Sequence, residues 1–379
     1  MKNHRFSSAF VSALLLCGLA CPVQAADKKV KVFILAGQSN MEGYGMLGSL
    51  DHLGSHPKYG HLLKKLKNTD GTWATRDDVT VYWKAESKEK THGPLSTNWG
   101  AMTGKSIGPE LMFGTIMGER HNEHVLLIKA AWGGVGVWSG FRSPGAGKMT
   151  WNERRILKRD HWLKVGYHYR KMVSDIKECL ANIRDVVPAY KGQGYEIVGM
   201  AWLQGWNDYC EWHLQLDGKR VGLGLIERYP HNLAAMFRDL RRDLNVPDLP
   251  IVMGELGVGG HGMTKKATDP RQHEAVAMVQ FRKAQKAVAD DASLKNVTLV
   301  PTADFWDARL QELRIMGDKY WDVKRKKKIK DSDANVLPTK KLNDEYWRRG
   351  GHWSCHYNGS ASTYCLIGYA LAEALLRAD

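Results

Sequence analysis

Two polar segments, one early and one late in the chain, carry residues that could perform acyl transfer. Ser39 follows the apolar run 30–37 and stands between Gln38 and Asn40. A serine hydroxyl is a weak nucleophile until a nearby base accepts its proton. His356 is the natural base, because a neutral imidazole works near pH 7. The pair predicts nucleophilic attack on a carbonyl group.

Two further segments could supply the hydrogen bonds that such an attack requires. Negative charge develops on the carbonyl oxygen, and donors must already face it. Gly133 follows the apolar run 125–131 and offers a backbone N–H that no side chain shields, while Asn207 offers a side-chain amide. The N–H of Ser39 would be the third donor. Alone, each segment could be an ordinary turn or helix cap, but their order at successive strand ends favours a catalytic site.

The elements that position these residues form an alternating pattern. Apolar runs predict strands, and segments with apolar residues every three or four positions predict helices. This alternation, with strands that are apolar on both faces, predicts a parallel sheet with helices on both sides. In such sheets, sites form at the carboxyl ends of the strands. The predicted strands cover 30–37, 125–131, 195–205, 249–257 and 296–303, and the helices cover 110–121, 163–183, 231–244, 274–289 and 360–377.

The same four segments resemble the SGNH hydrolases. The stretches "FILAGQSNM", "IKAAWGG", "WLQGWND" and "HYNGSA" are similar to the sialate O-acetylesterase branch, akin to carbohydrate esterase family six. The resemblance implies a three-layer α/β/α sandwich with a flavodoxin-like sheet, and removal of acetyl groups from sugars without a metal or other cofactor. It also implies Ser39 as nucleophile, His356 as base, and Gly133 and Asn207 as oxyanion donors.

The sequence departs from this family at the group that orients the histidine. Many relatives have an aspartate three residues before it, where this chain has Trp353, preceded by His352. Asp208 and Glu255 are therefore candidate orienting acids, and a backbone carbonyl is a third option. In addition, some carbohydrate-esterase relatives have Gln-Gly-Glu in the third block, where this chain has Gln-Gly-Trp ending at Trp206.

Aromatic and polar residues near the motifs are candidates for binding the substrate. Indole faces stack on sugar rings. Trp138, in a glycine-rich loop, and Trp206 are the predicted sugar contacts, with Gln38 beside the serine; Arg142 could meet a substrate carboxylate. Core packing is the alternative for each tryptophan.

The chain begins like an exported protein. Lys2 and Arg5 precede an apolar run that ends in Val-Gln-Ala, which is typical of a signal peptide cut near residue 25. Residues 1–25 are therefore predicted to be a signal peptide and 26–379 one esterase domain with long inserted loops, at 47–103, 134–159 and 306–354. The apolar run is too short for stable membrane insertion. Secretion or a periplasmic location follows.

Charge and cysteine content narrow the class of partner. The formal net charge is +15, which is compatible with an acidic polysaccharide; export and the absence of a nucleic-acid-binding motif argue against nucleic acid. The run "KRKKKIK" at 324–330 is predicted to be a solvated loop. Cys355 and Cys365 could form a disulfide, or all four cysteines after the signal could be buried thiols.

The leading hypothesis is thus an exported serine esterase that deacetylates a polysaccharide or glycoconjugate through an acetyl-enzyme. A glycan-binding protein on a degraded esterase scaffold, motivated by Trp353, is the alternative from another class. A lipase of the same superfamily is a third hypothesis, but no long apolar lid is visible in the sequence.

Overall fold

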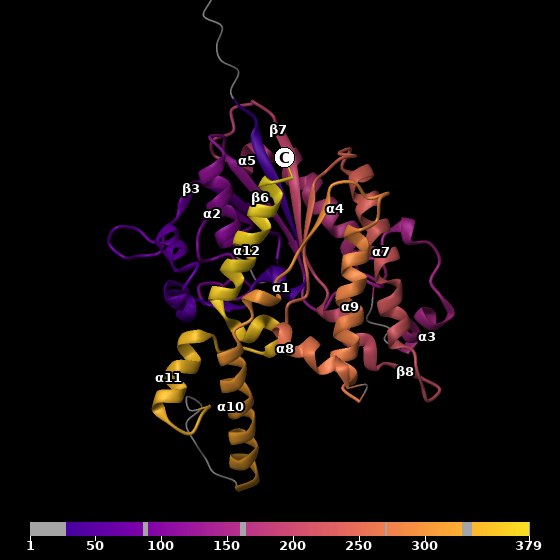
Figure 1. The fold of residues 1–379 in the computed structure, drawn as a ribbon. Helices are drawn as coiled ribbons and strands as arrows, with labels where there is room; N and C mark the ends of the chain where they lie inside the picture. The colour runs from indigo at the N-terminus through magenta and orange to yellow at the C-terminus, as the bar shows by residue number, and fades with distance from the viewer. Residues whose placement is uncertain (1–27, 86–89, 160–163, 270, 328–335, 379) are drawn as a thin grey trace, which may run out of the picture.

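A seven-stranded sheet forms the centre of the protein (Figure 1). The computed structural model describes residues 28–85, 90–159, 164–269, 271–327 and 336–378; the predicted signal peptide lies outside them. The strand order is β11-β10-β7-β1-β6-β3-β4, and each pair is parallel except β3 with β4. The strands are β1 (Val30–Gly37), β3 (Arg76–Tyr82), β4 (His92–Leu95), β6 (Val125–Ala131), β7 (Tyr195–Leu203), β10 (Ile251–Gly254) and β11 (Val297–Val300).

Helices cover both faces of this sheet. In Figure 1, α2 (Glu110–Arg120) and α12 (Ala361–Leu376) lie on one side, and α4 (Tyr167–Ala181), α7 (Gly222–Asp243) and α9 (His273–Ala289) lie on the other. The central strands are buried because helices pack on both faces, which is why they contain so few polar residues. The predicted α/β/α sandwich with a parallel sheet is confirmed.

Shorter helices and strand pairs occupy the connections. The short helices are α1 (Ser39–Glu42), α3 (Trp151–Arg159), α5 (Ile183–Val186), α6 (Trp206–Cys210) and α8 (Gly260–Lys265). Two small antiparallel pairs join β2 (Gly45–Met46) to β5 (Ser106–Ile107) and β8 (Gln215–Leu216) to β9 (Lys219–Arg220).

The five predicted strands are present, but the predicted loops hold more structure than expected. β3 and β4 lie within 47–103 and extend the sheet at one edge. The segment 306–354 contains α10 (Ala308–Lys327) and α11 (Lys340–Arg349). The first four residues of the basic run, 324–327, belong to α10, so the prediction of a loop is wrong there; the rest of the run lies outside the described residues.

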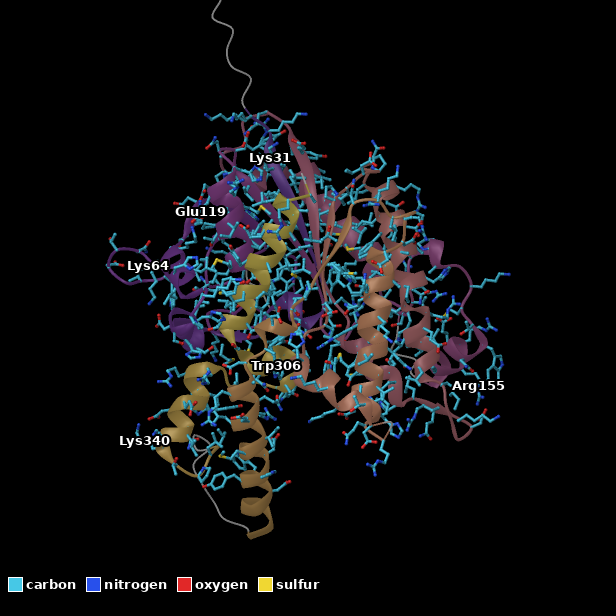
Figure 2. All side chains as sticks on the ribbon, in the orientation of Figure 1. Lys31, Lys64, Glu119, Arg155, Trp306 and Lys340 are labelled. Carbon is cyan, nitrogen blue, oxygen red and sulfur yellow. The ribbon has the colours of Figure 1, made fainter. Side chains whose placement is uncertain are left out.

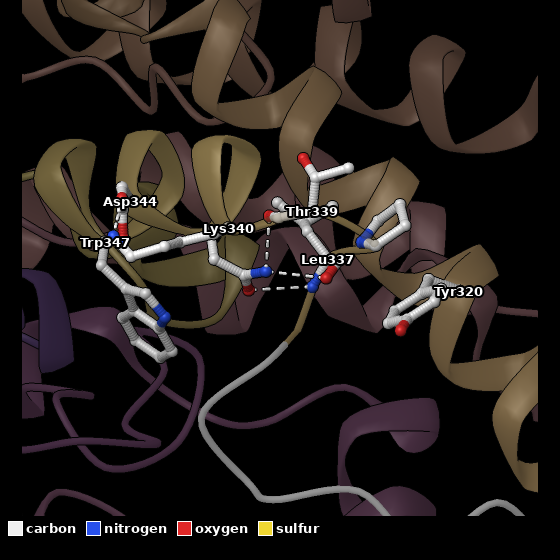
Figure 3. A pocket seen from close by; sticks show the side chains of 8 residues that line it. Tyr320, Leu337, Thr339, Lys340, Asp344 and Trp347 are labelled. Carbon is white, nitrogen blue, oxygen red and sulfur yellow. Dashed lines mark hydrogen bonds and ion pairs between the residues drawn. The ribbon is translucent and has the colours of Figure 1, made fainter.

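Helices α10 and α11 form a hairpin that projects beyond the carboxyl end of the sheet (Figure 1). A small apolar cluster of Leu310, Leu313, Leu337 and Tyr346 holds it together. A cavity of about 660 Å³ lies on the hairpin (Figure 3). There the Asn343 side chain binds the backbone N–H and C=O of Leu337, at 3.0 and 2.7 Å, so this side chain stabilises the hairpin itself.

The four described cysteines are free thiols, so the Cys355–Cys365 disulfide is not formed. Among the described residues, none of the helices has both the length and the hydropathy that crossing a membrane requires.

Candidate active site

Ser39 lies at the carboxyl end of the central strand, where the sheet changes direction of winding. β6 and β3 lie on one side of β1, and β7, β10 and β11 lie on the other, which is the topological switch point of an open α/β sheet. Gly37 ends β1 so close to β7 that an added Cβ would lie 2.1 Å from the Leu203 carbonyl oxygen. Only glycine fits there, and the chain then turns into α1 with Ser39 as its first residue.

The side chain of Gln38 connects the nucleophile segment to the end of β7. It is fully buried, and its Oε1 accepts hydrogen bonds from the backbone N–H groups of Gly205 at 3.0 Å and Asn207 at 3.2 Å. Its Nε2 has no partner among the described residues. The oxygen of Gln38, predicted to bind substrate, is thus occupied in fixing Asn207 relative to Ser39.

Gly133 lies directly beside Ser39. A Cβ added to Gly133 would lie 3.8 Å from the Ser39 Cβ and 3.1 Å from Oε2 of Glu42. Burial raises the pKa of the Glu42 carboxyl, and a hydrogen bond from the Gly133 N–H and the charge of Lys129 partly oppose that rise. The predicted oxyanion donor therefore also donates to a partly buried carboxyl group.

Asn40 ties the nucleophile segment to the histidine segment, more than 300 residues away. Its Nδ2 donates to the carbonyl oxygen of Cys355 at 3.1 Å, and its Oδ1 accepts from the Tyr364 hydroxyl at 2.7 Å. The neighbour of Ser39 is therefore bonded to the neighbour of His356. Within the described part of the chain no hydrogen bond joins Ser39 to His356; such bonds are often long in a free enzyme and shorten with substrate.

The imidazole of His356 has a histidine as its partner. Its Nδ1 lies 3.0 Å from Nδ1 of His352, and the Tyr44 ring stacks on it with centroids 4.1 Å apart and planes 8° apart. Burial, aided by His352, lowers the pKa of His356 to about 4. The exposed indole of Trp353 stacks near the same ring, with centroids 6.0 Å apart.

Neither candidate orienting acid bonds to His356. The buried carboxylate of Asp208 accepts from the backbone N–H of Val137 at 2.9 Å and Trp138 at 3.2 Å, and from Gln204 Nε2 at 2.5 Å. Burial raises its pKa to about 6, and these hydrogen bonds limit the rise. Asp208 instead holds the loop that follows Gly133.

Glu255 lies at the end of β10 among other charged groups. Burial raises its pKa, while Arg282 and His261 oppose the rise. The charges that act on it are therefore those of Arg282, His261 and Asp304, and its carboxylate has no described contact with His356.

Two predicted substrate contacts are buried. Trp138 is 2% exposed and packs with Ile156 and Leu225, so its face is not available to a sugar and the prediction is wrong for this residue. Arg142 is 4% exposed and pairs with Glu153 at 3.1 Å. Both side chains therefore stabilise the segment 134–159 by packing and by an ion pair.

A cavity of about 1090 Å³ opens beside the site, lined by Trp206, Trp212 and Trp306 among others. It runs past Ser354, two residues before His356, and past the loops that follow β10 and β11. Trp306 lies at the base of α10 (Figure 2). The cavity contains the predicted contact Trp206, and Trp212 and Trp306 are aromatic residues that sequence reasoning did not select.

Three side chains that the motifs did not identify contact the candidate residues: His352 and Tyr44 contact His356, and Glu42 interacts with Gly133. In the sequence, only their closeness to His356 or Ser39 could have indicated them. Among the described residues, no group of three His, Cys, Asp or Glu side chains is placed to hold a metal ion.

Comparisons with known proteins identify a family and relatives of this chain. Residues 29–308 match the family described as carbohydrate esterase, sialic acid-specific acetylesterase. A protein named "Probable carbohydrate esterase" from Arabidopsis thaliana is 24% identical over 241 residues, which is 63% of this chain and 73% of that protein.

Two solved structures are also similar. One is a protein from Arabidopsis thaliana, with a TM-score of 0.45 and 18% identity over 92% of this chain and 98% of that chain. The other is a carbohydrate acetylesterase from Xanthomonas citri, with a TM-score of 0.39 and 12% identity over 73% of this chain and 50% of that chain.

The role of Asp208 as a structural anchor gives a testable prediction. Asp208→Ala would leave the buried N–H groups of Val137 and Trp138, and one of the two N–H bonds of Gln204 Nε2, without an acceptor. The expected cost is about 2–4 kcal/mol in the free energy of unfolding. Thermal unfolding followed by circular dichroism should show a midpoint lower by about 5 °C or more. Asp344→Ala, which removes an exposed ion pair with Lys340 in α11, should change the midpoint little; equal midpoints for the two variants would contradict this role.

Proposed function

Because this chain belongs to the carbohydrate esterase, sialic acid-specific acetylesterase family, we propose that it removes O-acetyl groups from a carbohydrate through an acetyl-enzyme on Ser39. The observation that carries the proposal is the pair of side-chain bridges around that serine. Gln38 bonds to the segment of Asn207, and Asn40 bonds to the segment of His356. Nucleophile, base and donor thus lie on chain segments that are fixed to one another.

The proposed reaction has two half-reactions. The Ser39 hydroxyl oxygen bonds to the acetyl carbon while Nε2 of His356 accepts its proton. The tetrahedral oxyanion accepts hydrogen bonds from the Asn207 amide and the N–H groups of Ser39 and Gly133. The C–O bond to the sugar then breaks, and the imidazolium returns the proton to the departing sugar oxygen. Water, deprotonated by His356, attacks the acetyl-serine and releases acetate and Ser39.

The cavity beside the site supports an uncharged sugar chain as the part of the substrate next to the ester. Its tryptophan faces suit sugar rings. Its charged side chains include Glu274, Asp304 and Glu312 against Lys266, and Asp304 is paired with His261 at 2.6 Å. The acidic side chains that line the cavity do not favour the binding of a polyanion there, although the whole chain has a formal net charge of +15.

We also propose that the protein acts outside the cytoplasm, as the signal-peptide pattern in residues 1–25 indicates. The main alternative is a glycan-binding protein on an inactive scaffold. The observation that motivated it, Trp353 in place of an aspartate, loses weight because His352 bonds to His356 instead.

The first test is the substitution Ser39→Ala. The rate of p-nitrophenyl acetate hydrolysis and of acetate release from acetylated xylan should fall about 10³-fold or more, because the substitution removes the proposed nucleophile. The fold should be unchanged by circular dichroism. Ser293→Ala, near the amino end of β11, is the matched control and should keep full activity. An inactive wild type that still binds polysaccharide would support the glycan-binding alternative instead.

The second test is the pH dependence of kcat/KM on a soluble acetyl ester. A protonated imidazole cannot accept the proton of Ser39, and burial lowers the pKa of His356 to about 4. Activity should therefore persist through mildly acidic pH and decline only as the pH approaches about 4. Circular dichroism at each pH separates titration from unfolding. A decline centred near the ordinary histidine pKa of about 6.5 would contradict the role of a buried base.

The third test concerns the cavity. Trp212→Ala and Trp306→Ala should each raise KM for acetylated xylo-oligosaccharides by about 3- to 10-fold, because a stacking partner is lost. kcat/KM for p-nitrophenyl acetate, which has no sugar chain, should change little. Trp151→Ala removes an indole that is 60% exposed and outside the cavity and should have no effect on either. Equal KM values for all three variants, or a preference of the wild type for O-acetylated sialic acid, would contradict this assignment.

A further inference from the structure

We propose that His352 is a positioning residue that accepts the Nδ1–H of His356 and takes the place of the missing aspartate. The inference rests on the proposed function, since it concerns the base of the same reaction. It goes beyond that function in assigning a neutral imidazole to a task that the resemblance assigns to a carboxylate.

The contact between the two rings has the geometry of a single hydrogen bond. The two Nδ1 atoms are 3.0 Å apart, and the ring centroids are 4.9 Å apart with planes at 28°. Two protonated nitrogens would repel each other at this distance. One of the two atoms must therefore donate and the other accept.

The requirement of catalysis decides which atom donates. His356 can accept a proton at Nε2 only if its own hydrogen is on Nδ1. His352 must then accept at Nδ1 and carry its hydrogen on Nε2. This arrangement fixes both the tautomer and the orientation of the base, as the aspartate of a serine-hydrolase triad does.

The loop that carries both histidines is closed by its own backbone. The N–H groups of Gly351 and His352 both donate to the carbonyl oxygen of Asn358 at 2.9 Å, and the N–H groups of His356 and Asn358 both donate to that of Trp353, at 3.0 and 3.1 Å. These bonds, in and just before the kinked 3₁₀ segment Ser354–Gly359, bring residues four apart in sequence face to face. The rings therefore do not depend on their own contact to stay adjacent.

Strained backbone in this loop makes room for His352. Tyr357, Asn358 and Gly359 have φ values of 49°, 52° and 76°, and such values are uncommon for residues other than glycine. A Cβ added to Gly359 would lie 2.7 Å from the Cβ of His352. Strain of this kind persists where the surrounding structure fixes it, and it is concentrated at functional sites.

Packing and charge around the pair favour a neutral His352. The Tyr44 ring, from the segment after α1, covers both imidazoles, with centroids 4.1 Å from His356 and 5.0 Å from His352. Arg314, from α10, donates to the carbonyl oxygen of His352 at 3.1 Å. Burial and the charge of Arg314 both lower the pKa of His352, and burial raises the pKa of the neighbouring Cys355 thiol. The surroundings of the two histidines therefore favour the neutral form of both imidazoles.

The decisive experiment compares His352→Asn with His352→Leu. Asparagine has an acceptor, Oδ1, at the position of Nδ1, whereas leucine has a similar branched shape without an acceptor. kcat on p-nitrophenyl acetate should fall about 10²- to 10⁴-fold in His352→Leu and stay within about tenfold of wild type in His352→Asn, with KM unchanged in both. His61→Leu, at an exposed histidine of the Gly60–Leu66 turn, is the control and should keep full activity.

A pH profile separates positioning from a purely structural role. His352 contributes to the lowered pKa of His356, so the acid limb of log kcat/KM should move to higher pH in His352→Asn. The proposal is wrong if His352→Leu keeps wild-type kcat, if both variants lose kcat equally while folded, or if the acid limb of His352→Asn stays where it is in wild type. The proposed function itself would be rejected if the wild-type protein has no esterase activity, or if Ser39→Ala keeps full activity.

Discussion

The hydrogen bond from the Asn40 side chain to the carbonyl oxygen of Cys355 is the contact on which the candidate site depends most. It joins residues 315 positions apart, and its donor and acceptor are the direct neighbours of Ser39 and His356. The orientation of the Asn40 side chain is fixed because its oxygen also accepts a hydrogen bond from Tyr364, a buried residue of α12. Both polar ends of the buried Asn40 amide therefore have partners, and they connect the segments of Ser39 and His356 although no described hydrogen bond joins these two residues directly.

The same principle operates around the rest of the carboxyl edge of the sheet. The strands end there, so their backbone N–H groups lose their partners and need others. The Gln38 side chain accepts hydrogen bonds from backbone N–H groups after β7, and the Asp208 carboxylate accepts one in the loop after β6. Lys129, buried on β6, donates to the carbonyl oxygens of Glu42 and Trp99 and pairs with Glu110 at 2.9 Å. These side chains make the site rigid because each satisfies several groups that cannot reach water.

The sequence predicted what depends on local pattern. Apolar runs predicted β1, β6, β7, β10 and β11. The rule that sites form at the carboxyl ends of parallel strands predicted that Ser39 and Asn207 would lie near each other. β3 was missed because its first half, "RDD", is polar, and only β6 and β4 complete its pairing. Trp138 was misassigned because its glycine-rich context suggested exposure, while its burial depends on Ile156 and Leu225 from other segments. Contacts of that kind have no signature in a single sequence.

The contact between His352 and His356 could not be predicted for a related reason, and it bears on the proposed chemistry. A spacing rule identifies an aspartate three residues before the histidine, but a closed loop with positive φ angles brings the residue four before it into contact instead. A neutral imidazole stabilises the imidazolium less than a carboxylate would. Glu42 already places a carboxyl group near Ser39, because a Cβ added to Gly133 would lie 3.1 Å from its Oε2 and 3.8 Å from the Ser39 Cβ. Like charges in a poorly solvated site repel strongly, so under the proposed mechanism an uncharged partner for His356 adds no second negative charge to the region of the oxyanion.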